Sequence, residues 1–157
     1  FEGRSRFMRE TVAAVREVWP ENLPLAVRLS VTDWIDGGLT IEDNIQMATA
    51  LKDLGVDMID CSGGGATPAA RASVGTRTAD QVALAGELRA ATGMITAGVG
   101  CITNAKQAEN VITSGRADLA FMAREHLRDP HVAARMAREL GVPPKNHLPL
   151  QLGFFDG

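Results

Sequence analysis

MITAGVG (Met94–Gly100) and LAFMAR (Leu119–Arg124) are two short, mostly apolar runs, and each ends in residues suited to binding an anion. Glycine lets backbone N–H groups approach an anion closely, and the N-terminus of a following helix adds a favourable dipole. An arginine at the next strand end can donate two hydrogen bonds to the same anion. In a (β/α)8 barrel, the loops after strands 7 and 8 often bind phosphate. The two runs therefore predict the second half of a phosphate-binding barrel that holds a cofactor.

Apolar, strand-like runs alternate with amphipathic, helix-like segments along the chain. Such alternation is typical of parallel strands joined by helical crossovers, in either an open doubly wound sheet or a closed barrel. The first strand lacks a following G-x-G-x-x-G turn, which disfavours a dinucleotide-binding open sheet. The predicted helices span 5–19, 41–54, 79–91, 104–114 and 130–140, and the predicted strands span 25–30, 57–62, 94–97 and 117–122.

The number of repeating units limits the architecture. A complete barrel needs about 250 residues, whereas this chain of 157 residues supplies only four strand–helix units. A lone four-stranded parallel sheet would leave both edges and one face uncovered. We therefore predict an α/β fold of the TIM (β/α)8-barrel class, in which residues 1–141 supply strands 5–8 with their helices. Residues 142–157 are expected to form an irregular C-terminal tail.

The composition excludes several functional classes. Hydrophobic residues make up 45% of the chain and charged residues 22%, which is ordinary for a globular protein. The net charge is −3 without a long basic run, so we expect no nucleic-acid partner. No stretch has the length of a membrane helix and the first residues lack a signal peptide, so we expect no membrane association. Because the chain starts at Phe1 rather than methionine, upstream sequence is expected to be missing.

The two cysteines, Cys61 and Cys101, are too few for a disulfide framework and lack metal-site spacing. This usage predicts a reducing, cytoplasmic setting and no metal site. Neither residue has an obvious activating base, so both are expected to be small buried residues rather than nucleophiles.

One charged residue interrupts the first predicted strand, LAVRLS (Leu25–Ser30). A charge within an apolar strand costs several kcal/mol unless it is paired or bound to a ligand. One interpretation of Arg28 is a buried ion pair with Asp60 or Asp33. The other places Arg28 at the C-terminal mouth of a barrel, where it donates hydrogen bonds to an electron-rich ligand atom.

The other candidate ligands share a position at predicted strand ends: Ser62, Gly98, Gly100, Ala123 and Arg124. Ser62 opens a glycine-rich loop that could line the same site. Structural alternatives remain for the rest, because glycine-rich strand-to-helix turns are common and Arg124 could pair with Glu125 or Asp129 on the surface.

Several segments resemble the old yellow enzyme family of flavoproteins. RSRFMRE (Arg4–Glu10) resembles the N-R-x-R-F segment of that family, and four later segments resemble its barrel strands five to eight. These segments are Leu25–Ser30, Gly55–Ser62, Gly98–Gly100 and Gly115–Arg124, and Leu127–Pro130 completes the match. The similarity extends from Arg4 to about Gly141. It is greatest to the bacterial thermophilic-like branch, which includes xenobiotic reductases.

The resemblance implies an FMN-dependent ene-reductase that takes hydride from NAD(P)H and reduces the activated C=C bond of enones and enals. It implies that Arg28 faces the pyrimidine edge of the flavin and that Gly100, Ala123 and Arg124 bind the phosphate. The family's substrate-orienting pair, either His/His or His/Asn, and its usual tyrosine proton donor lie in the first half of the barrel. We therefore expect no catalytic residue in this chain, which alone would be inactive.

The partners that the resemblance implies are a small-molecule substrate, a missing N-terminal half-barrel and further copies of the chain in a homo-oligomer. Two alternative functions remain open. The chain could be a non-catalytic half-barrel that self-associates, or part of another phosphate-binding TIM-barrel enzyme.

Overall fold

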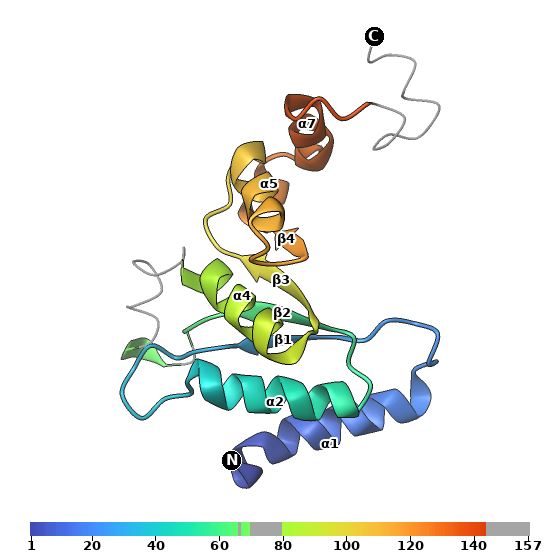
Figure 1. Cartoon of the computed structure of the whole chain (residues 1–157), viewed down its shortest axis with the longest axis vertical. Coiled ribbons are helices and arrows are strands. Elements are labelled where there is room, and N and C mark those ends of the chain that lie inside the picture. Colours follow the sequence, from blue (N-terminus) through green and yellow to red (C-terminus); the bar gives the residue numbers. More distant parts are fainter. Residues whose placement is uncertain (66, 70–79, 144–157) are drawn as a thin grey trace.

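The structure, a computed structural model, describes residues 1–65, 67–69 and 80–143. Four strands form one parallel sheet in the order β1-β2-β3-β4 (Figure 1). The strands are β1 (Ala26–Ser30), β2 (Met58–Ser62), β3 (Ile95–Val99) and β4 (Leu119–Phe121). The helices are α1 (Glu2–Val18), α2 (Ile41–Asp53), α4 (Asp80–Thr92), α5 (Ala105–Thr113), α6 (Arg124–Arg128) and α7 (Val132–Glu139). The predicted tail from residue 144 onward lies outside the described residues.

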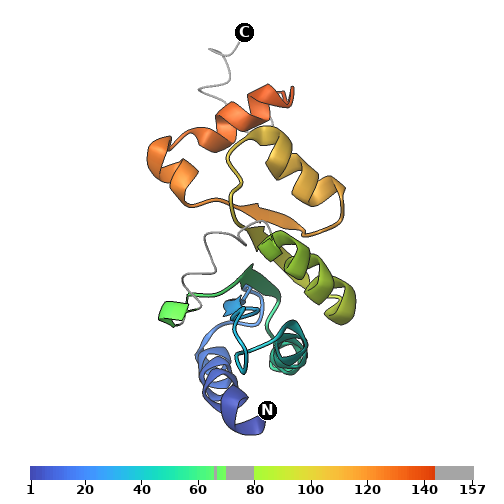
Figure 2. The same ribbon diagram turned by 90° about the vertical axis from the view of Figure 1, so that its left-hand side faces the viewer.

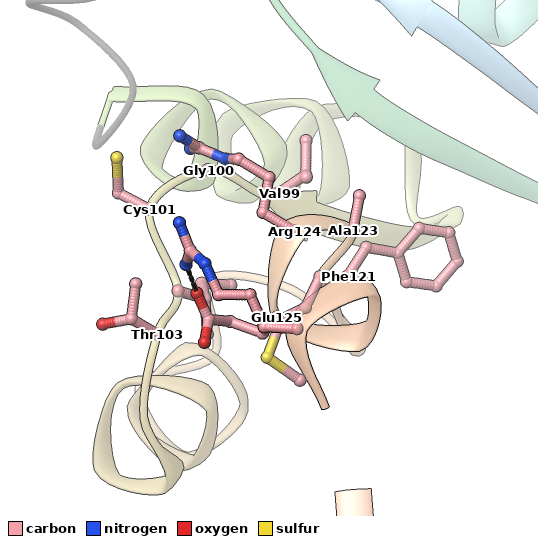
Figure 3. Close-up of a pocket in the computed structure, with 11 residues that line it drawn as sticks. Val99, Gly100, Cys101, Thr103, Phe121, Ala123, Arg124 and Glu125 are labelled. Carbon is pink, nitrogen blue, oxygen red and sulfur yellow. Dashed lines mark hydrogen bonds and ion pairs between the residues drawn. The ribbon is translucent and has the colours of Figure 1, made fainter. Parts of the chain in front are cut away.

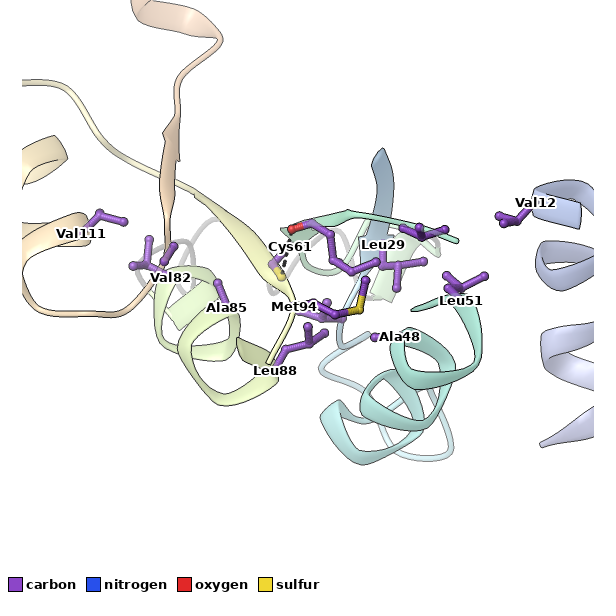
Figure 4. Packing of buried hydrophobic residues seen from close by; sticks show 14 of the residues in the cluster. Val12, Leu29, Ala48, Leu51, Cys61, Val82, Ala85, Leu88, Met94 and Val111 are labelled. Atoms are coloured by element: carbon purple, nitrogen blue, oxygen red, sulfur yellow. Dashed lines mark hydrogen bonds between the residues drawn. The ribbon is translucent and has the colours of Figure 1, made fainter. Parts of the chain in front are cut away.

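The two faces of the sheet differ in burial. Successive side chains of a strand point to opposite faces, and the strand register aligns Leu29 with Cys61 on the helix-covered face. Both side chains are buried with Leu51 of α2 and Leu88 of α4 in the main hydrophobic core (Figure 4). This packing explains why β1 and β2 are largely apolar at alternate positions.

The opposite face of the sheet is open. Its apolar side chains remain exposed, at 50% for Ile95, 42% for Leu119 and 36% for Phe121. In a closed barrel this face would form the barrel interior and would be filled by side chains of the remaining strands. The four-stranded sheet therefore has the architecture of a partial TIM barrel, as the sequence predicted.

The helices lie along the sheet in chain order and give the molecule an elongated shape (Figure 2). At one end α1 packs on α2, and at the other α7 packs on α5. None of the described helices combines the length and the apolar character that crossing a membrane requires.

Local sequence signals account for the start of α2. Thr40 and Asp43 form a reciprocal capping box, in which the Asp43 N–H donates to Thr40 Oγ1 at 3.3 Å and the Thr40 N–H donates to Asp43 Oδ2 at 3.2 Å. These bonds satisfy two donors that a helix start otherwise leaves unpaired. The helix predicted to begin at residue 41 does begin at Ile41, with Thr40 as its N-cap.

The structure corrects several predicted boundaries. β3 continues to Val99, because Gly98 pairs with Cys61 on one side and Ala120 on the other. The predicted strand 117–122 shortens to the three residues of β4. α6 was not predicted. An ion pair between Glu125 and Arg128, three residues apart, supports this short helix.

Candidate functional site

The C-terminal ends of the four parallel strands meet at one edge of the sheet, and the following loops gather there. The loops after β1 and β2 are hydrogen-bonded, since the Gly64 N–H donates to the Thr32 carbonyl at 2.7 Å. They also pack closely, because a Cβ atom at Gly63 would lie only 2.8 Å from the ring of Trp34. This edge is where α/β barrels bind their ligands.

A pocket of about 220 Å³ lies where the loops after β3 and β4 meet (Figure 3). Gly100, Cys101 and Thr103 line it from the first loop, and Ala123 and Arg124 line it from the second. Gly100 has a φ of 124°, a backbone conformation that favours glycine. The structure thus brings together three of the residues predicted to bind phosphate: Gly100, Ala123 and Arg124.

Arg124 is an exposed cation at this pocket, and its side chain reaches towards the loop of Gly100 in Figure 3. Glu125 pairs with Arg128 instead, and Asp129 pairs with Arg135 at 3.0 Å. Within the described part of the chain, Arg124 itself makes no hydrogen bond or ion pair. The surface-pair alternative with Glu125 or Asp129 is therefore wrong, and no described residue occupies the donors of the Arg124 guanidinium.

A second polar cluster lies on the open face of the sheet, on β1 and β2. Arg28 Nη1 donates to Asp60 Oδ2 at 2.6 Å, and Arg28 Nη2 donates to Ser62 Oγ at 3.0 Å. Of the two partners considered for Arg28, Asp60 is confirmed, whereas Asp33 accepts from the Leu39 N–H at 2.9 Å. The interpretation of Arg28 as a buried charge is wrong, because its side chain is 57% exposed on the open face of the described sheet.

Gly98 lies apart from the other candidates. A Cβ atom there would lie 3.4 Å from Ala117 and 3.5 Å from both Val111 and Val82, all on the helix-covered side of the sheet. Gly98 does not line the pocket at Gly100, although only one residue separates the two glycines. The small size of Gly98 therefore serves close packing between β3 and the helices.

The sequence model of the NADH:flavin oxidoreductase / NADH oxidase family matches residues 1–142. The chain belongs to this family. The match covers all four strands, the pocket at Gly100 and Arg124, and the polar cluster of Arg28 and Asp60. It confirms the resemblance to old yellow enzymes.

Related proteins support the assignment to the NADH:flavin oxidoreductase family. The chain is 44% identical over 141 residues to an NADPH dehydrogenase of Bacillus velezensis and 42% identical over 141 residues to one of Bacillus subtilis. Each alignment covers 90% of this chain and 40% of the relative, so the chain spans less than half the length of these curated relatives. Among solved structures, 2-naphthoyl-CoA reductase in complex with 2-naphthoyl-CoA superposes with a TM-score of 0.77 at 26% identity. That superposition covers 88% of this chain and 21% of the reductase.

In this NADH:flavin oxidoreductase family member, Asp60 was predicted from the sequence only as a possible ion-pair partner of Arg28. The side chain is 11% exposed and lies level with Arg28 in the strand register, two residues before Ser62. The period of two along a strand was the available signal, because it places residues 60 and 62 on one face. Asp60 therefore joins the candidate site.

The two cysteines differ in their surroundings. Burial, with a smaller contribution from the charge of neighbouring Asp60, raises the pKa of the Cys61 thiol to about 12. Such a thiol is inert as a nucleophile at neutral pH. Cys101 is exposed at the pocket, so the prediction that both cysteines are buried is wrong for this residue.

Proposed function

We propose that this chain is the C-terminal half of an FMN-binding barrel in an NADPH-dependent ene-reductase. The observation that carries the proposal is the exposed guanidinium of Arg124, which has no partner among the described residues and lines a pocket with Gly100. A cation and a closely approachable backbone are what a phosphate group requires. The NADPH dehydrogenases among the relatives support the choice of hydride donor.

The donors of this chain fit the two ends of FMN. The phosphate needs a compact anion site, which the pocket of Gly100, Ala123 and Arg124 provides. The flavin ring has an electron-rich pyrimidine edge, which suits the exposed guanidinium of Arg28. Ser62 lies beside Arg28 and accepts a hydrogen bond from it. We assign these residues, without Gly98, to the cofactor site.

Each group of the chain then has a defined task. Arg124 binds the phosphate and anchors the cofactor at the ends of β3 and β4. Arg28 stabilises the negative charge that develops at the pyrimidine edge when the ring is reduced, an electrostatic effect that is strong in a water-excluded site. Bound FMN supplies the chemistry of accepting hydride from NADPH and passing it to the alkene. The residues that orient the substrate and supply the proton belong to the other half of the barrel.

The open face of the sheet supports the assignment of residues 1–141 to half a barrel. Ile95, Leu119 and Phe121 are exposed there, and β1 and β4 are the edges of the described sheet. Exposed parallel edges and an apolar face require a cover. We propose that four preceding strand–helix units of the complete polypeptide provide it. We further propose that the complete protein is a cytoplasmic homo-oligomer that acts on a small-molecule substrate.

The test uses the complete polypeptide that contains this chain. We expect the purified protein to release FMN on denaturation. Under anaerobic conditions it should oxidise more than one equivalent of NADPH per flavin only when a cyclic enone is added, with the saturated ketone as product. Absence of bound flavin after reconstitution with FMN would refute the proposal. A flavoprotein that oxidises NADPH with oxygen but leaves enones and enals intact would retain the dehydrogenase assignment and exclude the ene-reductase.

A further inference from the structure

Asp60 is a buried carboxylate beside Arg28, and the proposed function gives it no role. The residue is 8% exposed, and its Oδ1 atom is buried without a hydrogen-bond partner among the described residues. A buried carboxylate is costly unless it is paired, because it loses its hydration. Among the described residues its charged partner is Arg28, which contacts Asp60 Oδ2 at 2.6 Å. The guanidinium of Arg28 is therefore the described cation that compensates the Asp60 charge.

The same pair restricts Arg28. Asp60 and Ser62 lie two residues apart on β2, on the face that carries Arg28, and each accepts a hydrogen bond from a different Nη atom. Two anchors on one rigid strand hold the planar guanidinium in a fixed orientation, although its side chain is 57% exposed. Arginine has five N–H donors, so others remain for a ligand on the open face.

We propose that Asp60 is a positioning residue of the flavin site, which orients Arg28 and offsets part of its positive charge. This inference rests on the proposed function. A lone arginine beside the flavin would strongly favour the negatively charged reduced state over the neutral oxidised ring. With the Asp60 carboxylate at 2.6 Å, the pair is close to neutral, so the preference for the reduced state is weaker. Ser62 orients the guanidinium without changing its charge.

The variant Asp60→Asn in the FMN-loaded complete protein separates charge from shape. Asparagine retains an oxygen acceptor for Arg28 but removes the negative charge. We expect the ratio of the affinities for reduced and oxidised FMN to rise about tenfold, which is a potential about 30 mV more positive for a two-electron couple. Ser62→Ala is the matched control, since it removes a neutral anchor, and we expect a much smaller change in potential.

The double variant Arg28→Met/Asp60→Asn tests whether Asp60 acts through Arg28. We expect Asp60→Asn to shift the potential less when Arg28 is already absent. Equal shifts in both backgrounds would show an independent charge and overturn the positioning role, as would an unshifted potential in Asp60→Asn. A wild-type protein that binds no FMN would refute the proposed function itself, whereas bound FMN with an unchanged potential refutes only the role of Asp60.

Melting temperatures of the apoproteins test the Arg28–Asp60 pair independently of FMN and show whether the variants fold. Arg28→Met alone leaves the Asp60 carboxylate buried without its cation, so we expect a lower melting temperature than that of the wild type. The double variant is expected to recover part of this loss. An unchanged melting temperature in Arg28→Met would overturn the pairing on which the inference stands.

Discussion

Replacing Arg124 with alanine tests the anion pocket directly, because the side chain has a place at the pocket but no partner elsewhere in the described residues. Since Arg124 is exposed and pairs with no described residue, its loss should change the free energy of unfolding of the apoprotein by less than about 0.5 kcal/mol. A hydrogen bond to a charged group contributes about 1.5–3 kcal/mol. Because 1.4 kcal/mol corresponds to tenfold, the Kd for FMN should rise roughly 10- to 150-fold.

Flavin fluorescence titration of the apoprotein measures this effect, and riboflavin provides the internal comparison. Riboflavin carries the same ring as FMN but lacks the phosphate, so Arg124→Ala should leave its affinity unchanged. Arg6→Ala is the matched control. Arg6 is an exposed arginine of α1, which pairs with Glu10 of the same helix and does not line the pocket. This control makes the same change in net charge.

Two results would refute the reasoning on Arg124. An unchanged affinity for FMN would mean that Arg124 is a solvated surface cation. An equal loss for FMN and riboflavin would mean that the substitution disturbs the ring site or the fold rather than a phosphate contact.

Three further predictions concern the fold. The 157-residue chain expressed alone should oligomerise or aggregate through the open face and the edge strands β1 and β4. A chain that sediments as a monodisperse monomer and melts cooperatively would contradict the half-barrel assignment. Thr40→Ala in the complete protein should lower the free energy of unfolding by about 1 kcal/mol in urea denaturation, because it removes the capping box with Asp43, whereas Thr49→Ala within the same helix should cost less. The hydrogen bonds from Arg89 lower the pKa of Asp118 below its ordinary value of 3.8, so their stabilisation is present above that pH and is lost as the pH falls through the folded-state pKa. The stability difference between wild type and Asp118→Asn should therefore shrink on acidification, and a difference independent of pH would contradict this linkage.

Local signals in the sequence predicted much of the fold. The apolar strand runs, the helix start at Ile41 and the alternation of strands with helices depend on neighbours within a few residues. Boundaries were less predictable where pairing with other strands decides them. Gly98 joins β3 because both of its neighbouring strands extend to its level. α6 was missed because its five residues form too short a segment for a periodic pattern.

The candidate site was predicted only in part. Gly100, Ala123 and Arg124 could be named from the sequence, because each follows an apolar run at a strand end. Their convergence on one pocket depends on how the loops after β3 and β4 fold together. Arg124 has no partner among the described residues because Glu125 pairs with Arg128 and Asp129 pairs with Arg135. The sequence could not predict these ion pairs, because Glu125 and Asp129 each have several arginines within a few residues.

By itself, the sequence determined the order of elements, the parallel sheet and the family, because these depend on periodicity and on short motifs. The tertiary structure alone decided the environment of each charge. Arg28 is exposed because no described element covers its face of the sheet, and it pairs with Asp60 because the strand register sets these residues, 32 positions apart, side by side. Gly98 and Gly100 differ because Gly98 lies within β3, whereas Gly100 follows the strand's end with a φ of 124° and lines the pocket. Burial and pairing are properties of contacts between distant segments, and such contacts exist only once the strands have aligned.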